Sequence, residues 1–251
     1  MRCAVSDFDR TLYVEERISQ ADRQAVEEWQ GRGDLFVVAT GRDEGALKEK
    51  LSFWQVFPDA LILNNGARII DGQGRELFCR AMERETALGV LDYFAQADEA
   101  GTGVSIRGRK LNVLARPGAP TTQKPCGGEI LMEDARRLQG ILQLHHRRPD
   151  SPEAIRKMCR EINRLFPKAA AYANVWNADV VAKGIHKAGA IRILEQKLGP
   201  FEEIRVIGDS INDLDMIQAY HGTTLPWAAP EVLTAALNVA GSVEEWLKAE
   251  R

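Results

Sequence analysis

Two aspartates, Asp7 and Asp9, lie one residue apart where the first apolar run of the sequence ends. If this run is a strand, its side chains alternate between two faces, so Asp7 and Asp9 point the same way while Phe8 points toward the core. Two carboxylates this close repel each other unless a divalent cation lies between them or one carboxyl keeps its proton. Both arrangements suit catalysis. The alternative is an ordinary strand end in a polar turn, with Asp9 capping a following helix.

Three further polar clusters follow short, mainly apolar runs at residues 35–39, 60–63 and 204–207. Apolar runs of this length are typical of strands buried on both faces of a parallel sheet. In such sheets, ligands bind at the carboxyl ends of the strands. The clusters are therefore candidate ligand sites: Thr40-Gly41-Arg42, Asn64-Asn65-Gly66-Ala67 and Gly208-Asp209-Ser210-Ile211-Asn212-Asp213.

Helices are predicted between these strands, at residues 19–30 with Ser19 as N-cap, at 43–51 and at 187–198. The alternation of strands and helices predicts an α/β fold, with a doubly wound parallel sheet that is Rossmann-like. Two short elements near residues 223–225 and 238–240 and a helix at 243–248 are expected to complete this part of the chain.

The alternation stops between about Glu76 and Lys183. Strand pairs joined by short polar turns are typical there, which favours an antiparallel sheet with helices on one face. We therefore predict a core domain of residues 1–75 and 184–251 and an inserted α+β cap domain of residues 76–183. The elements expected in the cap are helices at 84–96 and 152–165, strands at 103–107, 110–115 and 140–145, and a hairpin at 169–182.

With these elements in place, the chain resembles phosphatases of the haloacid dehalogenase (HAD) superfamily, in the large-cap, Cof-type branch with a C2B cap. Four family motifs match in order and spacing, and the resemblance covers the whole chain. One short match is weak evidence, whereas four in order, each at a predicted strand end or helix start, are strong. The motifs are Asp7-Phe8-Asp9-Arg10-Thr11-Leu12, Thr40-Gly41-Arg42, Lys187 and Gly208-Asp209-x-x-Asn212-Asp213.

Phosphoryl transfer needs an in-line nucleophile, neutralised phosphate oxygens and a proton for the leaving group. Asp7 can form an aspartyl-phosphate, and Asp9 can donate a proton and later accept one from water. The remaining phosphate oxygens can be held by a hydroxyl, a backbone N–H, a fixed positive charge and an amide. These groups are expected from Thr40, Gly41, Lys187 and Asn212.

Mg²⁺ prefers oxygen ligands and keeps several waters, so a few carboxylates and a phosphate oxygen suffice to hold it. The resemblance implies the Asp7 side chain, the Asp9 backbone carbonyl and Asp209 as ligands. It also implies that Asp213 orients waters or Lys187.

Two arginines are candidate substrate-binding residues. Arg42 can hold an anionic group, or it can pair with Asp43 or solvent. Arg10 stands where the family usually has Gly, and its guanidinium is expected to line the entrance of the site.

A second departure from the family pattern is Thr224–Ala229, which replaces the usual Gly-Asn-Ala turn. His145 to Arg148 either contact substrate or form an exposed strand end.

Composition excludes several classes of protein. The 251-residue chain has 45% hydrophobic and 27% charged residues, which is ordinary for a globular protein. Its formal net charge of −3 lacks the excess of positive charge that binding to nucleic acid or an anionic membrane requires. Its four cysteines form no Cys-x-x-Cys pair, so reduced thiols and a cytoplasmic location are expected. No apolar stretch approaches the ~20 residues of a membrane span.

The predicted function is Mg²⁺-dependent hydrolysis of a small phosphorylated metabolite by a monomer or weak homodimer. A sugar phosphate or glycosyl-phosphoglycerate is the first expectation, with flavin or pyridoxal phosphates also open. A phosphotransferase on the same core and a non-catalytic sugar-phosphate sensor are the alternatives. The second acid, Asp9, argues against the related ATPases, and the large cap argues against the small-cap mutases.

Overall fold

The structure, a computed structural model, describes residues 1–97, 99–124 and 126–249. Its internal contacts divide it into two units. The first comprises Met1–Thr40, Glu49–Cys79 and His186–Arg251, and the second comprises Gly41–Lys48 and Arg80–Ile185. The predicted domain limits at residues 75/76 and 183/184 lie a few residues before two of these junctions. The assignment of the units as core and cap stays a prediction.

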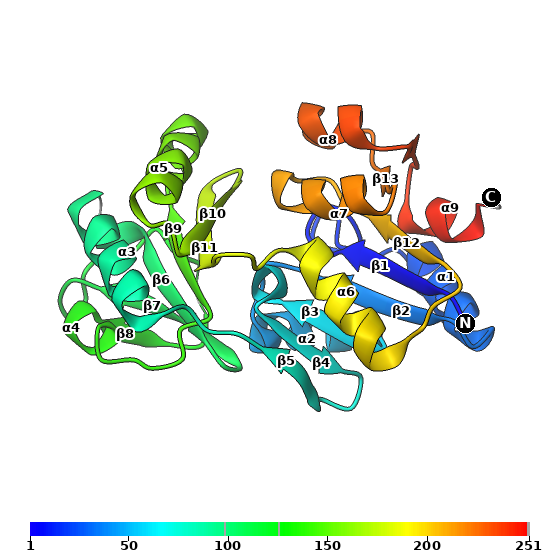
Figure 1. Cartoon of the computed structure of the whole chain (residues 1–251), viewed down its shortest axis with the longest axis horizontal. Helices are drawn as coiled ribbons and strands as arrows, with labels where there is room; N and C mark the ends of the chain where they lie inside the picture. Colours follow the sequence, from blue (N-terminus) through cyan, green and yellow to red (C-terminus); the bar gives the residue numbers. More distant parts are fainter. Residues whose placement is uncertain (98, 125, 250–251) are drawn as a thin grey trace. The chain divides into compact units, whose positions relative to one another are not determined.

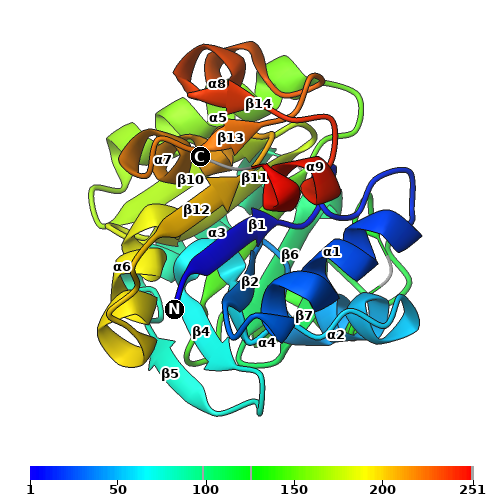
Figure 2. The same cartoon turned by 90° about the vertical axis from the view of Figure 1, so that its right-hand side faces the viewer.

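The first unit contains a mixed eight-stranded sheet in the order β14-β13-β12-β1-β2-β3-β4-β5. The strands from β14 to β3 are parallel, and β4 and β5 extend the sheet in antiparallel fashion. Figure 2 shows β1 between β12 and β2. This arrangement confirms the predicted α/β fold. The strands are β1 (Cys3–Asp7), β2 (Leu35–Ala39), β3 (Ala60–Leu63), β4 (Arg68–Asp71), β5 (Glu76–Cys79), β12 (Ile204–Ile207), β13 (Thr223–Thr224) and β14 (Asn238–Val239).

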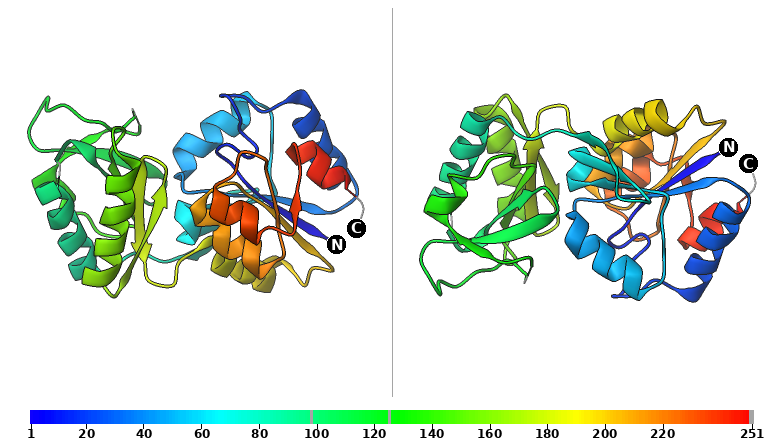
Figure 3. Two further views of the ribbon diagram at one scale, coloured as in Figure 1. Left: turned by 90° about the horizontal axis from the view of Figure 1, so that it is seen from above. Right: turned by 90° about the horizontal axis from the view of Figure 1, so that it is seen from below.

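Helices cover both faces of this sheet, with α1 and α9 on one side and α6 and α7 on the other (Figure 3). On the α6 side, Ile191 and Met216 are fully buried in one core with strand residues such as Val5. Burying each such side chain stabilises the fold by about 1.5–3 kcal/mol. The helices are α1 (Gln20–Gly31), α2 (Glu44–Phe53), α6 (Lys187–Leu198), α7 (Leu214–Ala219), α8 (Pro230–Ala235) and α9 (Val243–Lys248), of which α2 crosses the junction between the units.

Helix α1 begins where the sequence predicts it. The Ser19 hydroxyl accepts a hydrogen bond from the backbone N–H of Asp22, which satisfies one of the free donors of the first turn. The buried face of the helix includes Val26 and Trp29, and the Trp29 indole donates to the Leu35 carbonyl at 3.0 Å. This contact fixes α1 against the start of β2.

The second unit contains a six-stranded sheet in the order β10-β11-β9-β6-β7-β8. Helices α3 and α5 lie on one face of it (Figure 1), where Phe94 and Ile162 are fully buried. The predicted α+β character of this segment is thus present. Its elements are β6 (Thr102–Ile106), β7 (Arg109–Leu114), β8 (Glu129–Leu131), β9 (Gln143–Arg147), β10 (Ala169–Asn174), β11 (Asn177–Ala182), α3 (Arg84–Ala97), α4 (Met132–Ala135) and α5 (Pro152–Leu165).

Two expectations for β9 need correction. The strand begins at Gln143 rather than Gly140, because Gly140 adopts a left-handed conformation with φ of 67° that interrupts an extended strand. His145 and His146 do not form an exposed strand end, since both are buried. His145 Nε2 lies 2.7 Å from the Ser105 hydroxyl, and His145 Nδ1 lies 3.0 Å from Asp179. Burial and the charge of Lys110 lower the pKa of His145 against the opposing effect of Asp179.

In the described ranges, every helix is too short or too polar to cross a bilayer.

Candidate active site

Three neighbouring parallel strands, β12, β1 and β2, bring three of the four predicted motifs to one edge of the first sheet. In the register of the sheet, Ser6 of β1 pairs with Ile207 of β12, and Asp7 pairs with Ala39 of β2. The residues that follow β12 and β2 therefore emerge beside Asp7, at the carboxyl ends where open α/β sheets bind ligands.

Lys187 links two of the predicted carboxylates. Its ammonium nitrogen lies 2.6 Å from Asp7 Oδ1 and 2.5 Å from Asp213 Oδ1. Lys187 and Asp213 are fully buried, and Asp7 is 5% exposed. The lysine reaches this position because it begins α6, whose first turn is capped by His186 Nδ1 accepting from the Gly189 N–H at 3.3 Å.

Asp209, which follows β12, is also fully buried. Its carboxylate accepts hydrogen bonds from the hydroxyls of Thr11 at 3.1 Å and Ser210 at 3.2 Å. The backbone N–H groups of Asp209 and Ser210 donate in turn to Asp213 Oδ2, which completes a capping box around the turn. The turn thus fixes both carboxylates of the fourth motif.

Burial, together with the crowding of like charges, raises the pKa of two of these carboxyls. Burial, followed by the nearby Asp213 carboxylate, raises the pKa of Asp7 well above its usual range, although Lys187 opposes this. Burial and Asp213 also raise the pKa of Asp209 to about 6, against the lowering effect of Arg10. Such perturbations concentrate at functional sites because the protein holds like charges together there.

The three carboxylates fit a divalent cation. Asp7, Asp209 and Asp213 each offer one oxygen, and these oxygens all lie within 4.8 Å of one another. Hard oxygen donors with excess negative charge suit Mg²⁺. Asp9 is outside this side-chain group; it follows the end of β1, is half-buried and forms a backbone bridge with Tyr13.

Thr40 directly follows β2 and is 1% exposed. Its backbone N–H donates to the Ile62 carbonyl at 2.8 Å, which holds it beside β3. Gly41 and Arg42 follow it directly but group with the second unit, where the Gly41 carbonyl accepts a hydrogen bond from Gln143 Nε2 at 3.2 Å.

Asn65 belongs to one of the predicted polar clusters, but the sequence assigned it no role of its own in the site. It lies in the turn after β3, where Asn64, Asn65 and Gly66 all have positive φ, at 50°, 55° and 104°. The Asn65 N–H donates to the Thr40 carbonyl at 2.9 Å, and its Oδ1 accepts from Asn212 Nδ2 at 3.0 Å. Asn65 therefore ties two predicted phosphate-binding residues together. The sequence signal was the Asn-Asn-Gly run, since these residue types tolerate left-handed conformations.

Gly66 allows this turn to approach α6. A Cβ atom at this position would lie 2.8 Å from the His186 carbonyl, closer than such atoms come in proteins. Since His186 precedes Lys187, a glycine here lets the turn pack directly against the residue that introduces the buried lysine.

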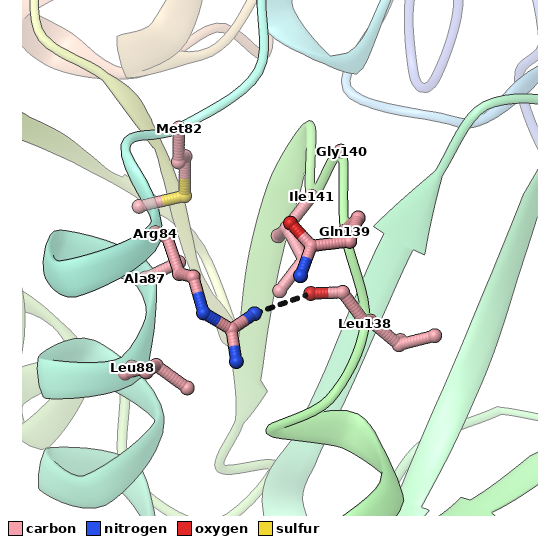
Figure 4. Close-up of a pocket in the computed structure, with 8 residues that line it drawn as sticks. All are labelled: Met82, Arg84, Ala87, Leu88, Leu138, Gln139, Gly140 and Ile141. Atoms are coloured by element: carbon pink, nitrogen blue, oxygen red, sulfur yellow. Dashed lines mark hydrogen bonds between the residues drawn. The ribbon is translucent and has the colours of Figure 1, made fainter.

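A separate pocket of about 130 Å³ lies in the second unit, between the start of α3 and the segment before β9 (Figure 4). Met82 and Ile141 contribute apolar walls, and the exposed Arg84 donates to the Leu138 carbonyl at 3.3 Å. None of the predicted catalytic residues lines this pocket.

The sequence matches one protein family over nearly its whole length. The sequence profile of the haloacid dehalogenase-like hydrolases matches residues 4–125 and 127–246. A curated relative, an uncharacterized protein of Mycoplasma capricolum, is 35% identical over 94 residues, which are 35% of this chain and 35% of the relative. The match thus spans about a third of the relative's length.

Solved structures share the fold over nearly the whole chain. A haloacid dehalogenase-like hydrolase of B. subtilis has a TM-score of 0.86 at 17% identity and covers 100% of both chains. A HAD/COF-like hydrolase of Plasmodium vivax has a TM-score of 0.83 at 16% identity, over 98% of this chain and 94% of that one. A sugar phosphatase of HAD subclass IIB has a TM-score of 0.78 at 19% identity, over 99% of this chain and 96% of that one.

The sequence profile spans nearly the whole chain, and the four motifs lie at one edge of the sheet apart from Gly41 and Arg42, which group with the second unit. The chain belongs to the haloacid dehalogenase-like hydrolases.

Proposed function

We propose that the chain is a phosphatase that hydrolyses a small phosphomonoester through an aspartyl-phosphate on Asp7. One observation carries the proposal: Asp7, at the end of the central strand, is buried within hydrogen-bonding distance of a buried lysine and clustered with two further carboxylates. A carboxylate in such a place can act as a nucleophile toward a bound phosphoryl group.

The reaction has two steps. An Asp7 carboxylate oxygen attacks phosphorus, the bond from phosphorus to the substrate oxygen breaks, and Asp9 donates a proton to the leaving alkoxide. Water then attacks the phosphorus of the aspartyl-phosphate while Asp9 accepts its proton. The bond from Asp7 to phosphorus breaks, and inorganic phosphate leaves with the carboxylate restored.

Mg²⁺ would be held by the Asp7 and Asp209 side chains and the Asp9 backbone carbonyl, with Asp213 nearby. When bound, this ion supplies positive charge that neutralises the carboxylates and the phosphate oxygens. The oxygen donor set described above supports this choice of metal.

Side chains around Asp7 would hold the substrate phosphate. We assign Lys187 and Asn212 to this role together with the Thr40 hydroxyl and the Gly41 N–H, because charge and hydrogen-bond donors aimed at developing negative charge stabilise the transition state. Arg10 and Arg42 are proposed to contact further anionic groups of the substrate.

The substrate is proposed to be a sugar phosphate or a glycosyl-phosphoglycerate, with residues 76–183 acting as a cap that selects it. The sugar phosphatase among the structural relatives supports this substrate class by its fold. We further propose a cytoplasmic monomer or weak homodimer that acts on a small phosphorylated metabolite, rather than on nucleic acid or a membrane.

A panel of phosphomonoesters tests the proposal. With Mg²⁺ present, the chain should release inorganic phosphate from at least one sugar phosphate, EDTA should abolish release, and added Mg²⁺ should restore it. Asp7→Asn serves as the control for contaminating phosphatase. Turnover that persists after thorough chelation would contradict the metal assignment, and turnover retained by Asp7→Asn would contradict the covalent mechanism.

A further inference from the structure

Arg10 and Trp227 form two hydrogen bonds with each other. Arg10 Nη2 donates to the Trp227 carbonyl at 2.9 Å, and Trp227 Nε1 donates to the Arg10 carbonyl at 2.8 Å. Arg10 lies in the loop after β1 and Trp227 in the loop after β13. The two residues are 217 positions apart in the sequence and meet in the folded chain.

The backbone at Arg10 favours a different residue type. Its φ is 65°, in the left-handed region, which disfavours side chains other than those of Gly, Asn and Asp. Hydrogen bonds hold it there, since the Arg10 N–H donates to the Tyr13 carbonyl at 2.8 Å and its carbonyl accepts from Trp227. Strained residues of this kind cluster at functional sites, so the strain at Arg10 indicates a role for its side chain.

The Arg10 side chain reaches the acidic cluster. Its Nη1 lies 3.4 Å from Asp209 Oδ2; the Asp209 side chain is fully buried, whereas the arginine is 49% exposed. The Trp227 loop contacts the same aspartate, because the Ala229 N–H donates to the Asp209 carbonyl at 2.9 Å. Lys187 contacts Asp7 and Asp213, so Arg10 supplies positive charge to the third member of the cluster.

We propose that Arg10, fixed in place by Trp227, is a built-in counter-ion of Asp209 that lowers the affinity of the acidic cluster for divalent cations. A cation bound by Asp209 would share its carboxylate with the guanidinium and would be repelled by a like charge a few ångströms away. Arg10 is half exposed, so water and salt weaken this repulsion. The inference rests on the metal-binding part of the proposed function and does not depend on phosphatase activity.

The test is a calorimetric titration of the chain with Mg²⁺ alone, without substrate. Arg10→Gly removes the charge and tolerates the positive φ, and Arg10→Gln removes the charge while keeping a polar side chain. Arg10→Lys keeps the charge. Trp227→Phe keeps a ring but loses the indole N–H. Arg17→Ala is the matched control, since Arg17 lies in the same loop and pairs with Glu15 at 3.5 Å.

Removal of the charge should tighten Mg²⁺ binding, with the Kd of Arg10→Gly and Arg10→Gln falling on the order of tenfold at low salt. Arg10→Lys and Arg17→Ala should bind as the unchanged chain does, and Trp227→Phe should fall between. Raising the salt concentration should reduce the difference in Kd between the neutral variants and the unchanged chain. Thermal unfolding in EDTA checks that each variant is folded.

Three outcomes would overturn the proposal: neutral variants that bind Mg²⁺ no more tightly, a lysine variant that binds as tightly as the glycine variant, or no Mg²⁺ binding by any chain. The last would also contradict the metal site of the proposed function. Failure to hydrolyse any phosphomonoester, by contrast, would leave the order of these binding constants unchanged, so the two failures are distinguishable.

Discussion

The ammonium nitrogen of Lys187 lies 2.5 Å from a carboxylate oxygen of Asp213, and both side chains are fully buried. Removing both charges from water is costly, and close contact offsets that cost only while both partners are present. Burial lowers the pKa of Lys187, but Asp213 and Asp7 outweigh this effect and raise it, so the lysine stays charged at physiological pH.

Lys187→Met should therefore destabilise the fold strongly. The substitution leaves Asp7 and Asp213 buried without their shared cation, and breaking a buried ion pair in this way costs about 3–5 kcal/mol. Urea unfolding at neutral pH measures the loss. Lys197→Met, at an exposed position in the last turn of the same helix, is the matched control and should change stability little. Equal effects of the two substitutions would show that the buried contacts contribute nothing.

Asp7→Asn and Asp9→Asn should each reduce kcat while the fold remains intact. Loss of an acid or base costs typically 10²–10⁴-fold, and loss of the nucleophile should cost more. Acid quenching during turnover separates the roles. A phosphorylated protein should be trapped with the unchanged chain and with Asp9→Asn, but not with Asp7→Asn. A phosphorylated Asp7→Asn variant would place the nucleophile elsewhere.

Asn65→Gly should lower kcat/KM without unfolding the chain. Glycine accepts the φ of 55°, so the backbone can keep its conformation. The hydrogen bond from Asn212 Nδ2 is lost, and such a bond contributes about 1 kcal/mol, which corresponds to roughly a fivefold decrease in kcat/KM. Steady-state kinetics on the best substrate measure the change. Glu15→Gly is the control because Glu15 is exposed and has a similar φ of 49°. A loss of activity shared by both variants would point to the backbone rather than to the amide.

The Arg2–Asp34 pair should make the free energy of unfolding depend on pH under acidic conditions. Burial raises the pKa of Asp34, but two side-chain hydrogen bonds from Arg2, at 2.9 and 2.6 Å, and one from its backbone outweigh this and lower it. The folded pKa then lies below the unfolded value of about 3.9. The stabilisation is therefore fully present above the unfolded pKa and is lost as the pH falls through the folded one.

Asp34→Asn provides the corresponding measurement. The variant should be less stable by about 1 kcal/mol at pH 7, since Arg2 is about one-third exposed and solvent screens the pair. Urea unfolding at several pH values should show this difference shrinking as the pH falls below about 4. A difference that stays constant with pH would mean that packing, rather than charge, explains it.

Local patterns in the sequence predicted much of the fold. The bounds of α5, Pro152–Leu165, agree with the prediction because the Ser151 hydroxyl caps the first turn by accepting from the Ala154 N–H, and a proline opens the helix. Strand β2 agrees in the same way, as an uninterrupted apolar run between polar turns. These features depend on neighbours in the chain, so the sequence displays them directly.

Other features depend on backbone conformation or on distant contacts and were not predicted. Strand β4 begins right after the left-handed turn that follows β3. Hydrophobic periodicity does not predict so tight a reversal of chain direction. The contact of Asn65 with Asn212 joins residues 147 positions apart, and that of Arg10 with Trp227 joins residues 217 positions apart. Such pairs become visible only once the sheet order is known.

The central position of β1 bears on how the chain acquires its structure. Strand β1 pairs with β2 on one side and with β12 on the other, and Cys3 lies opposite Ile204. Contacts between residues so far apart form slowly because a long loop must close before they contribute. The ribosome makes residues 204–207 after residues 80–185, so much of that segment can begin to fold before the β12 partner of β1 is available. The sheet that carries Asp7 is completed only after β12, β13 and β14 have been made.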